Sequence, residues 1–307
     1  MVFRTQRLTD RFSTLLLAAI SGLAIAAPAL AEVPLDWAQV RGSTSEVTLL
    51  SVGAEERPAL VTECLCPGDR LHASTHSRAE LLFNDGSLAR VGEQTSLYFL
   101  PNARRLSLSQ GTAAVFVPPD QGRTTLVTPN ATIGLNSTGV VVRYVPSRGL
   151  TLVMALANSP SGPVSITAGQ LEQETILFAG QMAFISSDTL QIVEFDLLEF
   201  YQTSQLMAGL HLDGGAYSPD ADDPLAALRF DLLLALSQQV PFSESDEILD
   251  PSEIRDLVPD PNSPAPESDI VAPTYPEEDL RPQNESPAGV EAPAGALTEP
   301  TPSDSTP

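Results

Sequence analysis

The sequence predicts an all-β protein, a sandwich or a short β-solenoid of about a dozen short strands, followed by two C-terminal helices and a disordered tail. From Trp37 to Phe195, alternating apolar residues are interrupted by turn signals roughly every 8–12 residues. Helical spacing of apolar residues occurs only after this part, and the end of the chain is rich in proline and acidic residues. These three observations divide the chain into a β body, a helical extension and a tail.

The N-terminus is typical of an export signal. Three Arg lie within the first eleven residues, and the run from Ser13 to Ala27 is almost wholly small and apolar. The motif "APALA" then ends at Ala31, where its small residues form a cleavage site before Glu32. We therefore expect a signal peptide over residues 1–31, a mature protein that begins at Glu32 without membrane insertion, and a periplasmic or extracellular location. The alternative is an uncleaved membrane anchor.

Residues 32–196 form the predicted β body, and the stretch "SRAELLFNDGSLARVGEQTSLYF" is its clearest hairpin. Asp85-Gly86 separates two apolar runs, and Gly86 tolerates the positive φ of a tight turn. We interpret Asp85 and Ser87 as turn residues, since the alternative roles of ligand or nucleophile lack a base: no His follows them until His211. Further strands are expected at "RRLSLSQGTAAVFV", "TTLVTPNATIGL", "TGVVVRYV", "LTLVMALA", "PVSITA", "ETILFAGQMAFIS" and "LQIVEF". Trp37 is expected to anchor the core, and Arg104-Arg105 to lie on a solvated edge.

Residues 197–240 form the predicted helical extension. "FDLLEFYQTSQLMAGL" predicts one helix from Phe195 to Leu210, ending near Gly209. "DDPLAALRFDLLLALSQQV" predicts a second one, with Asp222 or Asp223 as the cap and Pro224 in the first turn. Its apolar stripe consists of Leu225, Leu228, Leu232 and Leu236. We expect both helices to cover an open edge or end of the β body.

Residues 241–307 form the predicted disordered, acidic, Pro-rich tail, with 14 of the 27 prolines. It solubilises the protein or, alternatively, acts as a spacer or partner-binding arm. The whole chain has a net charge of −23, and its 16 basic residues are all Arg. Because nucleic acids and anionic membranes would be repelled, neither is expected as a partner.

Six short motifs in order resemble the FecR domain family. In that family a G-D turn leads a strand, S-R-A-E-L runs into D-G-S, a leucine strand ends in L-x-x-G, and T-P-x-A and A-G-Q follow. The matching positions are Gly68-Asp69, Ser77 to Leu81, Asp85 to Ser87, Leu108 to Gly111, Thr128 to Ala131 and Ala179 to Gln181. The resemblance spans about Trp37 to Phe195 and implies an all-β domain outside the cytoplasm.

Two departures limit what the resemblance implies about activity. After T-P-x-A the family carries R-G-T, whereas this chain has Asn136-Ser137-Thr138, so no role of that Arg is carried over. The family's regulators also have a cytoplasmic anti-sigma segment before a membrane span, and here only about a dozen residues precede the apolar run. An anti-sigma mechanism is therefore not expected.

The segment "CLCPGDRLHASTH" contains both cysteines and two of the three histidines, which suggests a metal site. Cys64, Cys66, His72 and His76 would complete a tetrahedral zinc site, but their C-x-C-x5-H-x3-H spacing is not a standard one. A local disulfide and free or packed thiols are the alternatives. We predict no metal, no cofactor and no catalytic residue.

These observations favour a non-enzymatic extracytoplasmic binding module that contacts an unknown envelope protein or polymer. The alternatives are a membrane-anchored FecR-like regulator and a carbohydrate-active enzyme with paired carboxylates. The few histidines and the short turns argue against catalysis. Arg90, Gln94 and Tyr98 are predicted to face outward and contact the partner.

Overall fold

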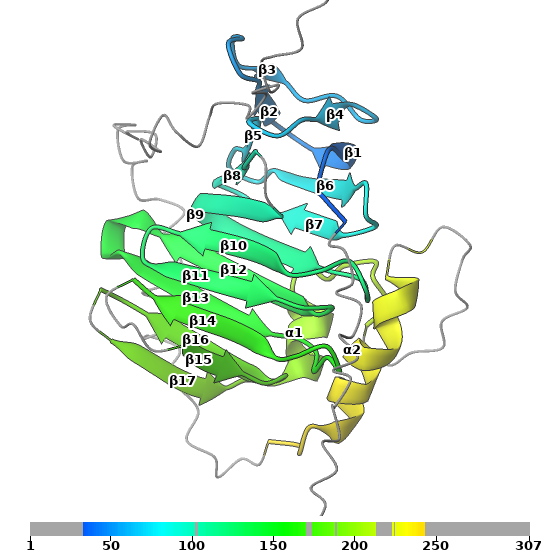
Figure 1. Ribbon diagram of the computed structural model, residues 1–307, viewed down its shortest axis with the longest axis vertical. Helices are drawn as coiled ribbons and strands as arrows, with labels where there is room; N and C mark the ends of the chain where they lie inside the picture. The colour runs from blue at the N-terminus through cyan, green and yellow to red at the C-terminus, as the bar shows by residue number, and fades with distance from the viewer. Residues whose placement is uncertain are drawn as a thin grey trace, which may run out of the picture.

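The computed structural model describes residues 33–101, 104–169, 174–187, 189–212, 223 and 225–242 (Figure 1). The predicted signal peptide and all but the first two residues of the predicted tail lie outside these ranges. The described residues form seventeen strands followed by two helices. The all-β prediction with two C-terminal helices is thus confirmed, and the seventeen strands, two of which have only two residues, exceed the expected dozen.

The strands form two facing sheets. Hydrogen-bonded neighbours in the first sheet follow the order β4 (Cys64–Leu65), β1 (Ala38–Thr44), β6 (Arg78–Phe83), β7 (Leu88–Val91), the second half of β9 (Arg105–Phe116), β12 (Gly139–Val145), β13 (Leu150–Ala155), β16 (Gln181–Ile185) and β17 (Leu190–Glu194). The second sheet follows the order β3 (Arg57–Pro58), β2 (Val47–Leu50), β5 (Arg70–Ala73), β8 (Thr95–Phe99), the first half of β9, β10 (Thr124–Thr128), β11 (Ala131–Leu135), β14 (Val164–Ala168) and β15 (Glu174–Leu177).

Strand β9 belongs to both sheets and connects them. Its first residues pair with β8 and β10, and its last residues pair with β7 and β12. Gly111 lies between these halves with a φ of +85°. Figure 1 shows the resulting stack, from β2–β4 at one end to β15 and β17 at the other.

The main core lies between the two sheets. Period-two alternation places one side of each strand inward, as in β6, where Ala79, Leu81 and Phe83 are buried and the residues between them are not. The Asp85-Gly86 hairpin is present as predicted: Leu82 pairs with Leu88, and Gly86 has a φ of +83°. The turn therefore determines which side of β7 faces the core.

Helix α1 (Leu197–Thr203) is shorter than the predicted Phe195–Leu210 helix. Asp196 caps its start by accepting a hydrogen bond from the backbone N–H of Glu199. Beyond Thr203 the backbone forms turns, and the carbonyls of Leu206 and Ala208 accept hydrogen bonds from Arg90. These tertiary hydrogen bonds take the place of the helical ones.

Helix α2 (Ala226–Gln238) buries the predicted stripe, with Leu236 partly buried. Asp223 accepts a hydrogen bond from the N–H of Leu225 at the helix start, whereas Asp222 and Pro224 lie outside the described residues. The helices cover the outer face of the first sheet, where α2 packs near Phe116 and Val141, and not an edge or end as predicted. That face is unusually apolar for a sheet exterior, which explains why it needs a cover.

Trp37 is not the expected core anchor, because its side chain is 43% exposed. It precedes β1, where Ala38 and Val40 occupy the inward positions, so the alternation turns Trp37 outward. Within the described part of the chain, no helix has the length and hydropathy to cross a membrane.

Candidate functional site

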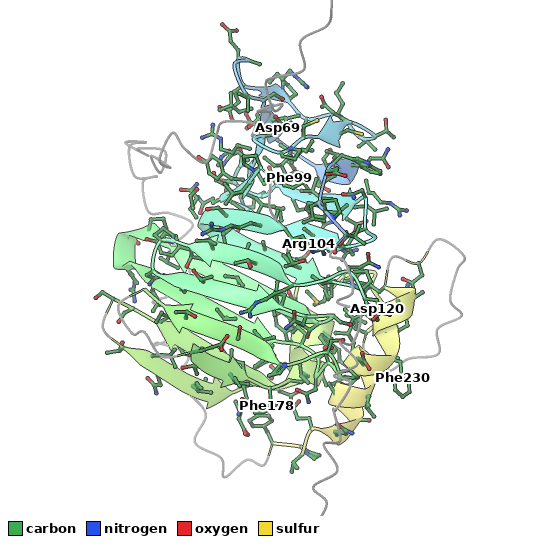
Figure 2. The ribbon with its side chains drawn as sticks, in the orientation of Figure 1. Asp69, Phe99, Arg104, Asp120, Phe178 and Phe230 are labelled. Atoms are coloured by element: carbon green, nitrogen blue, oxygen red, sulfur yellow. The ribbon has the colours of Figure 1, made fainter. Side chains whose placement is uncertain are left out.

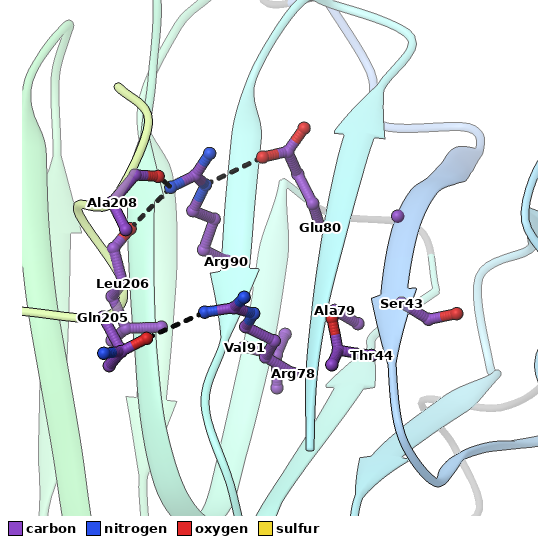
Figure 3. Close-up of a pocket in the computed structure, with 11 residues that line it drawn as sticks. Ser43, Thr44, Arg78, Ala79, Glu80, Arg90, Val91, Gln205, Leu206 and Ala208 are labelled. Carbon is purple, nitrogen blue, oxygen red and sulfur yellow. Dashed lines mark hydrogen bonds and ion pairs between the residues drawn. The ribbon is translucent and has the colours of Figure 1, made fainter. Parts of the chain in front are cut away.

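A pocket of about 270 Å³ lies on the outer face of the first sheet, beyond the area that the helices cover. Strands β1, β6 and β7 form its floor, and the turn after α1 forms one wall (Figure 3). Its lining consists of Gly42, Ser43, Thr44, Arg78, Ala79, Glu80, Arg90, Val91, Gln205, Leu206 and Ala208. It is therefore built from four segments, of which the turn after α1 is more than a hundred residues from the three strands in the sequence.

The charged groups of the pocket are held by one another and by the turn. The Arg90 Nε lies 2.7 Å from the Glu80 Oε2, since the two residues are directly opposite in the β6–β7 pair. The Arg90 Nη1 donates to the carbonyls of Leu206 and Ala208, at 2.9 and 2.7 Å. Arg90 thus ties the helical extension to the β body and is not the free outward group that the sequence predicts.

Arg78 is the more accessible cation of this pocket. It lies at the exposed start of β6, and its Nη1 donates to the Gln205 Oε1 at 3.0 Å. Figure 3 shows this guanidinium and that of Arg90 on the same side of the sheet. With two guanidiniums and one carboxylate, Glu80, the pocket is suited to holding a polar or anionic group.

The three predicted contact residues do not share a surface. Arg90 is on the first sheet, whereas Tyr98 is on the second, where the Arg70 guanidinium lies 5.8 Å from its ring centroid. Gln94 lies in the connection between the two sheets and has a φ of +50°. The chain passes from the first sheet to the second between β7 and β8. Outward residues of these two strands therefore lie on opposite sides of the molecule.

The Cys/His segment does not assemble a metal site. Cys64 and Cys66 are free and exposed next to β1 of the first sheet, while His72 is on β5 of the second sheet. The His72 Nδ1 lies 2.8 Å from the Ser96 Oγ, and burial lowers the pKa of this imidazole. His76 adopts a φ of +55° in the following turn. Among the described residues no cluster of three or more metal-ligating side chains occurs.

We predict that protein purified without added metal contains well below one zinc per chain. Cys64 lies on the first sheet and His72 on the second, and no three metal-ligating side chains of the described residues lie close enough together to hold an ion. Elemental analysis by mass spectrometry measures the content, with a Cys64→Ser/Cys66→Ser variant as the control. A stoichiometric zinc that this variant loses would contradict the prediction.

Arg104 lies in the core and not on the solvated edge expected of it. The sequence predicts Arg104-Arg105 on a solvated edge, yet the Arg104 side chain is 3% exposed (Figure 2). Its Nη2 lies 2.5 Å from the Asp85 Oδ2 and donates to the Thr124 Oγ1 at 2.9 Å. The prediction was wrong because the partner of this Arg is the turn aspartate, whose carboxylate would otherwise be buried without a counter-charge.

Asp85 and Ser87 have the turn role expected of them. The Asp85 Oδ1 accepts from the Ser87 N–H, and the Oδ2 accepts from the Ser87 hydroxyl, both at 2.8 Å. Every oxygen that could act on a ligand is therefore engaged within the turn or with Arg104.

The T-P-N-A motif links three turns of the β body. The Asn130 Nδ2 donates to the carbonyls of Gly149 and Ile185, at 2.7 and 2.9 Å, and its Oδ1 accepts from the hydroxyls of Thr128 and Thr151.

Ser137, in the turn after β11, has a φ of +49°, at the position where the R-G-T motif has glycine. The departure from that motif thus preserves the backbone turn.

Comparison with family models agrees with the motifs. Residues 69–155 match the family model described as FecR protein. Two solved structures of a proposed anti-sigma factor from Parabacteroides distasonis are similar at 13% and 12% identity, with TM-scores of 0.35 and 0.36. The matches cover 41% and 44% of this chain and 58% and 64% of those chains, so this chain spans less than two thirds of either.

No curated protein matches the chain. The family match runs from the start of β5 to the end of β13, which places the central strands of both sheets within it. The resemblance that the motifs predict is therefore confirmed over part of its extent: residues 69–155 of this chain match the FecR family model.

Proposed function

We propose that this protein is a non-enzymatic interaction module of the FecR type that works outside the cytoplasm and contacts a protein or another cell-envelope component. The observation that carries the proposal is the FecR match over residues 69–155. Domains of this family are regulatory and interaction modules. The matched residues of this chain contain the central strands of both sheets.

The chemistry of the pocket supports binding over catalysis. Hydrolysis of a sugar requires two carboxylates about 5–10 Å apart, one of them with a raised pKa. The pocket contains one carboxylate, Glu80, which is paired with Arg90. Burial raises the pKa of one carboxylate, Asp231, but this residue is on α2 and does not line the pocket.

Location and partner class are supported by the sequence. The Arg-rich start, the apolar run and "APALA" favour export. A net charge of −23 disfavours nucleic acid and anionic membrane. A protein or an envelope polymer remains as the partner, and it would bind at an exposed strand edge or on a part of a sheet's outer face that the helices leave open.

Affinity capture tests this function. The chain from Glu32 to Pro307 is immobilised and incubated with envelope extract, and the retained proteins and polymers are identified by mass spectrometry. The matched control is the tail alone, residues 241–307, which has 16 acidic residues and two Arg and therefore reproduces non-specific charge attraction. We expect one component to be retained by the longer chain alone. Equal retention by the tail, or no retention, would contradict the proposal.

A further inference from the structure

At the C-terminal end of the β body, two strand edges have no partner among the residues that the structure describes. Within the described residues, β15 pairs only with β14, and β17 pairs only with β16 (Figure 1). An uncovered edge presents unpaired N–H and C=O groups that can bind another strand.

The opposite end of the body is protected against such pairing. Its outermost strands, β3 and β4, have only two residues each. Pro58 occupies one of the two positions in β3 and has no N–H to donate, and Arg57 forms an ion pair with Glu63 there. Short strands, proline and charge are the usual means of blocking an edge, and β17, with five residues and no proline, has neither of the first two.

Backbone hydrogen bonds show which groups of β17 are available. Ser186 donates to Thr189 and Phe195 donates to Gly180, each at 2.9 Å, at the two ends of the β16–β17 pair. Because hydrogen-bonded and non-hydrogen-bonded pairs alternate in an antiparallel ladder, the N–H and C=O groups of Leu190, Ile192 and Glu194 point away from β16.

Apolar side chains accompany this edge. Ile192 lies opposite the core residue Ala183 and is nevertheless 39% exposed. Phe178, in the turn before β16, is 55% exposed and lies at the same end of the body in Figure 2. Ile176 on β15 and Leu198 on α1 are also exposed. An added strand would cover the Ile192 side chain and extend the core by one row.

Charge at this end selects the kind of strand that can bind. No Arg or Lys occurs between Arg148 and Arg229 in the sequence, and the Arg123 that reaches β15 is paired with Glu174. Glu194 on β17 and Glu199 on α1 are exposed. Like charges on neighbouring strands destabilise pairing, so a second copy of this acidic chain is disfavoured and a basic segment is favoured.

We propose that the outer edge of β17 binds an extended segment of a partner protein, with alternating apolar and basic residues, by addition of a strand to the first sheet. This inference rests on the proposed function as an interaction module. The backbone of Leu190, Ile192 and Glu194 provides the hydrogen bonds, Ile192 provides apolar contact, and the carboxylates provide the selectivity.

Labelled synthetic peptides test the edge directly. The probe is a short peptide with alternating Val and Lys, and its control is the same peptide with N-methyl groups on alternate amides, which keeps the charge and removes the donors on one edge. Fluorescence anisotropy at physiological salt is expected to show about tenfold or more weaker binding of the N-methylated peptide. Equal binding of the two peptides would show that charge attraction alone accounts for the binding, and this would overturn the proposal.

Two variants and one further measurement make the test specific to β17. Ile192→Pro removes an outward N–H but no β16–β17 hydrogen bond, and should weaken peptide binding about tenfold. Ile192→Ala retains the N–H and should bind more tightly than Ile192→Pro. In the wild-type protein, hydrogen exchange at Ile192 and Glu194 should slow when the peptide is added, and unchanged exchange would contradict strand addition even if a variant fails to fold.

The envelope component captured in the previous experiment separates this inference from the function on which it rests. If Ile192→Pro retains that component as well as the wild type does, the edge inference fails and the interaction function stands. If the wild type retains nothing, the function itself fails.

Discussion

Asp85→Ala is expected to destabilise the protein by about 3–5 kcal/mol, as removal of one partner from a buried ion pair usually does. The Asp85 carboxylate is fully buried and accepts hydrogen bonds from Ser87 and Arg104. Without it, the Arg104 guanidinium remains in the core with only Thr124 and the Val33 carbonyl as acceptors. Urea denaturation measures the loss from the shift in midpoint at an unchanged slope.

The control for this prediction is an exposed ion pair of the same chemical type. Arg123 and Glu174 lie 3.3 Å apart with half-exposed side chains, and Glu174→Ala should leave the midpoint nearly unchanged because solvent screens the pair. A double variant, Asp85→Ala/Arg104→Met, should recover part of the loss by removing the unpaired charge. If Asp85→Ala has no more effect than Glu174→Ala, the buried pair does not stabilise the fold as described.

Gly111→Ala is expected to cost about 3 kcal/mol or more, because it combines backbone strain with overlap. Gly111 has a φ of +85°, and an added Cβ would lie 2.2 Å from the Thr95 Oγ1 and 2.4 Å from the Thr95 Cα. Thr95 cannot move aside easily, since its hydroxyl accepts a hydrogen bond from the Thr112 N–H at 2.8 Å. The substitution therefore affects the point at which β9 passes from one sheet to the other.

Gly149→Ala separates strain from overlap. Gly149 also has a positive φ, +56°, but no atom lies within 4 Å of a Cβ built there. It should cost only about 1–2 kcal/mol, the usual penalty of the left-handed conformation. Thermal denaturation followed by circular dichroism compares the two variants, and equal losses would refute the proposed close contact at Gly111.

The sequence predicted the local features of this fold well. The Asp85-Gly86 hairpin and the apolar stripe of α2 depend on residues close together in the chain, and both are present. Features that depend on distant residues were missed. Arg104 is buried because Asp85, 19 positions earlier, faces it across the body, and α1 is short because Arg90 binds carbonyls more than a hundred residues later.

The candidate site shows the same division between local and distant features. The Cys/His segment is compact in sequence, but β4 and β5 belong to opposite sheets, so its ligands separate. The pocket combines β1, β6 and β7 with the turn after α1, and no motif indicates that combination. Arg78 and Glu80 alternate with apolar residues on β6, which was the only local signal that they face outward.

Native mass spectrometry of the mature chain with its captured envelope component tests the interaction function most directly. A binding module forms a complex whose mass is the sum of its two components and leaves the partner's mass unchanged. We predict this result for the protein from Glu32 onward. The partner's mass should stay unchanged in samples taken at successive times after mixing. A partner that is cleaved or otherwise changed in mass by the wild-type chain, and left intact by Glu80→Gln, would contradict the account and identify the pocket as catalytic.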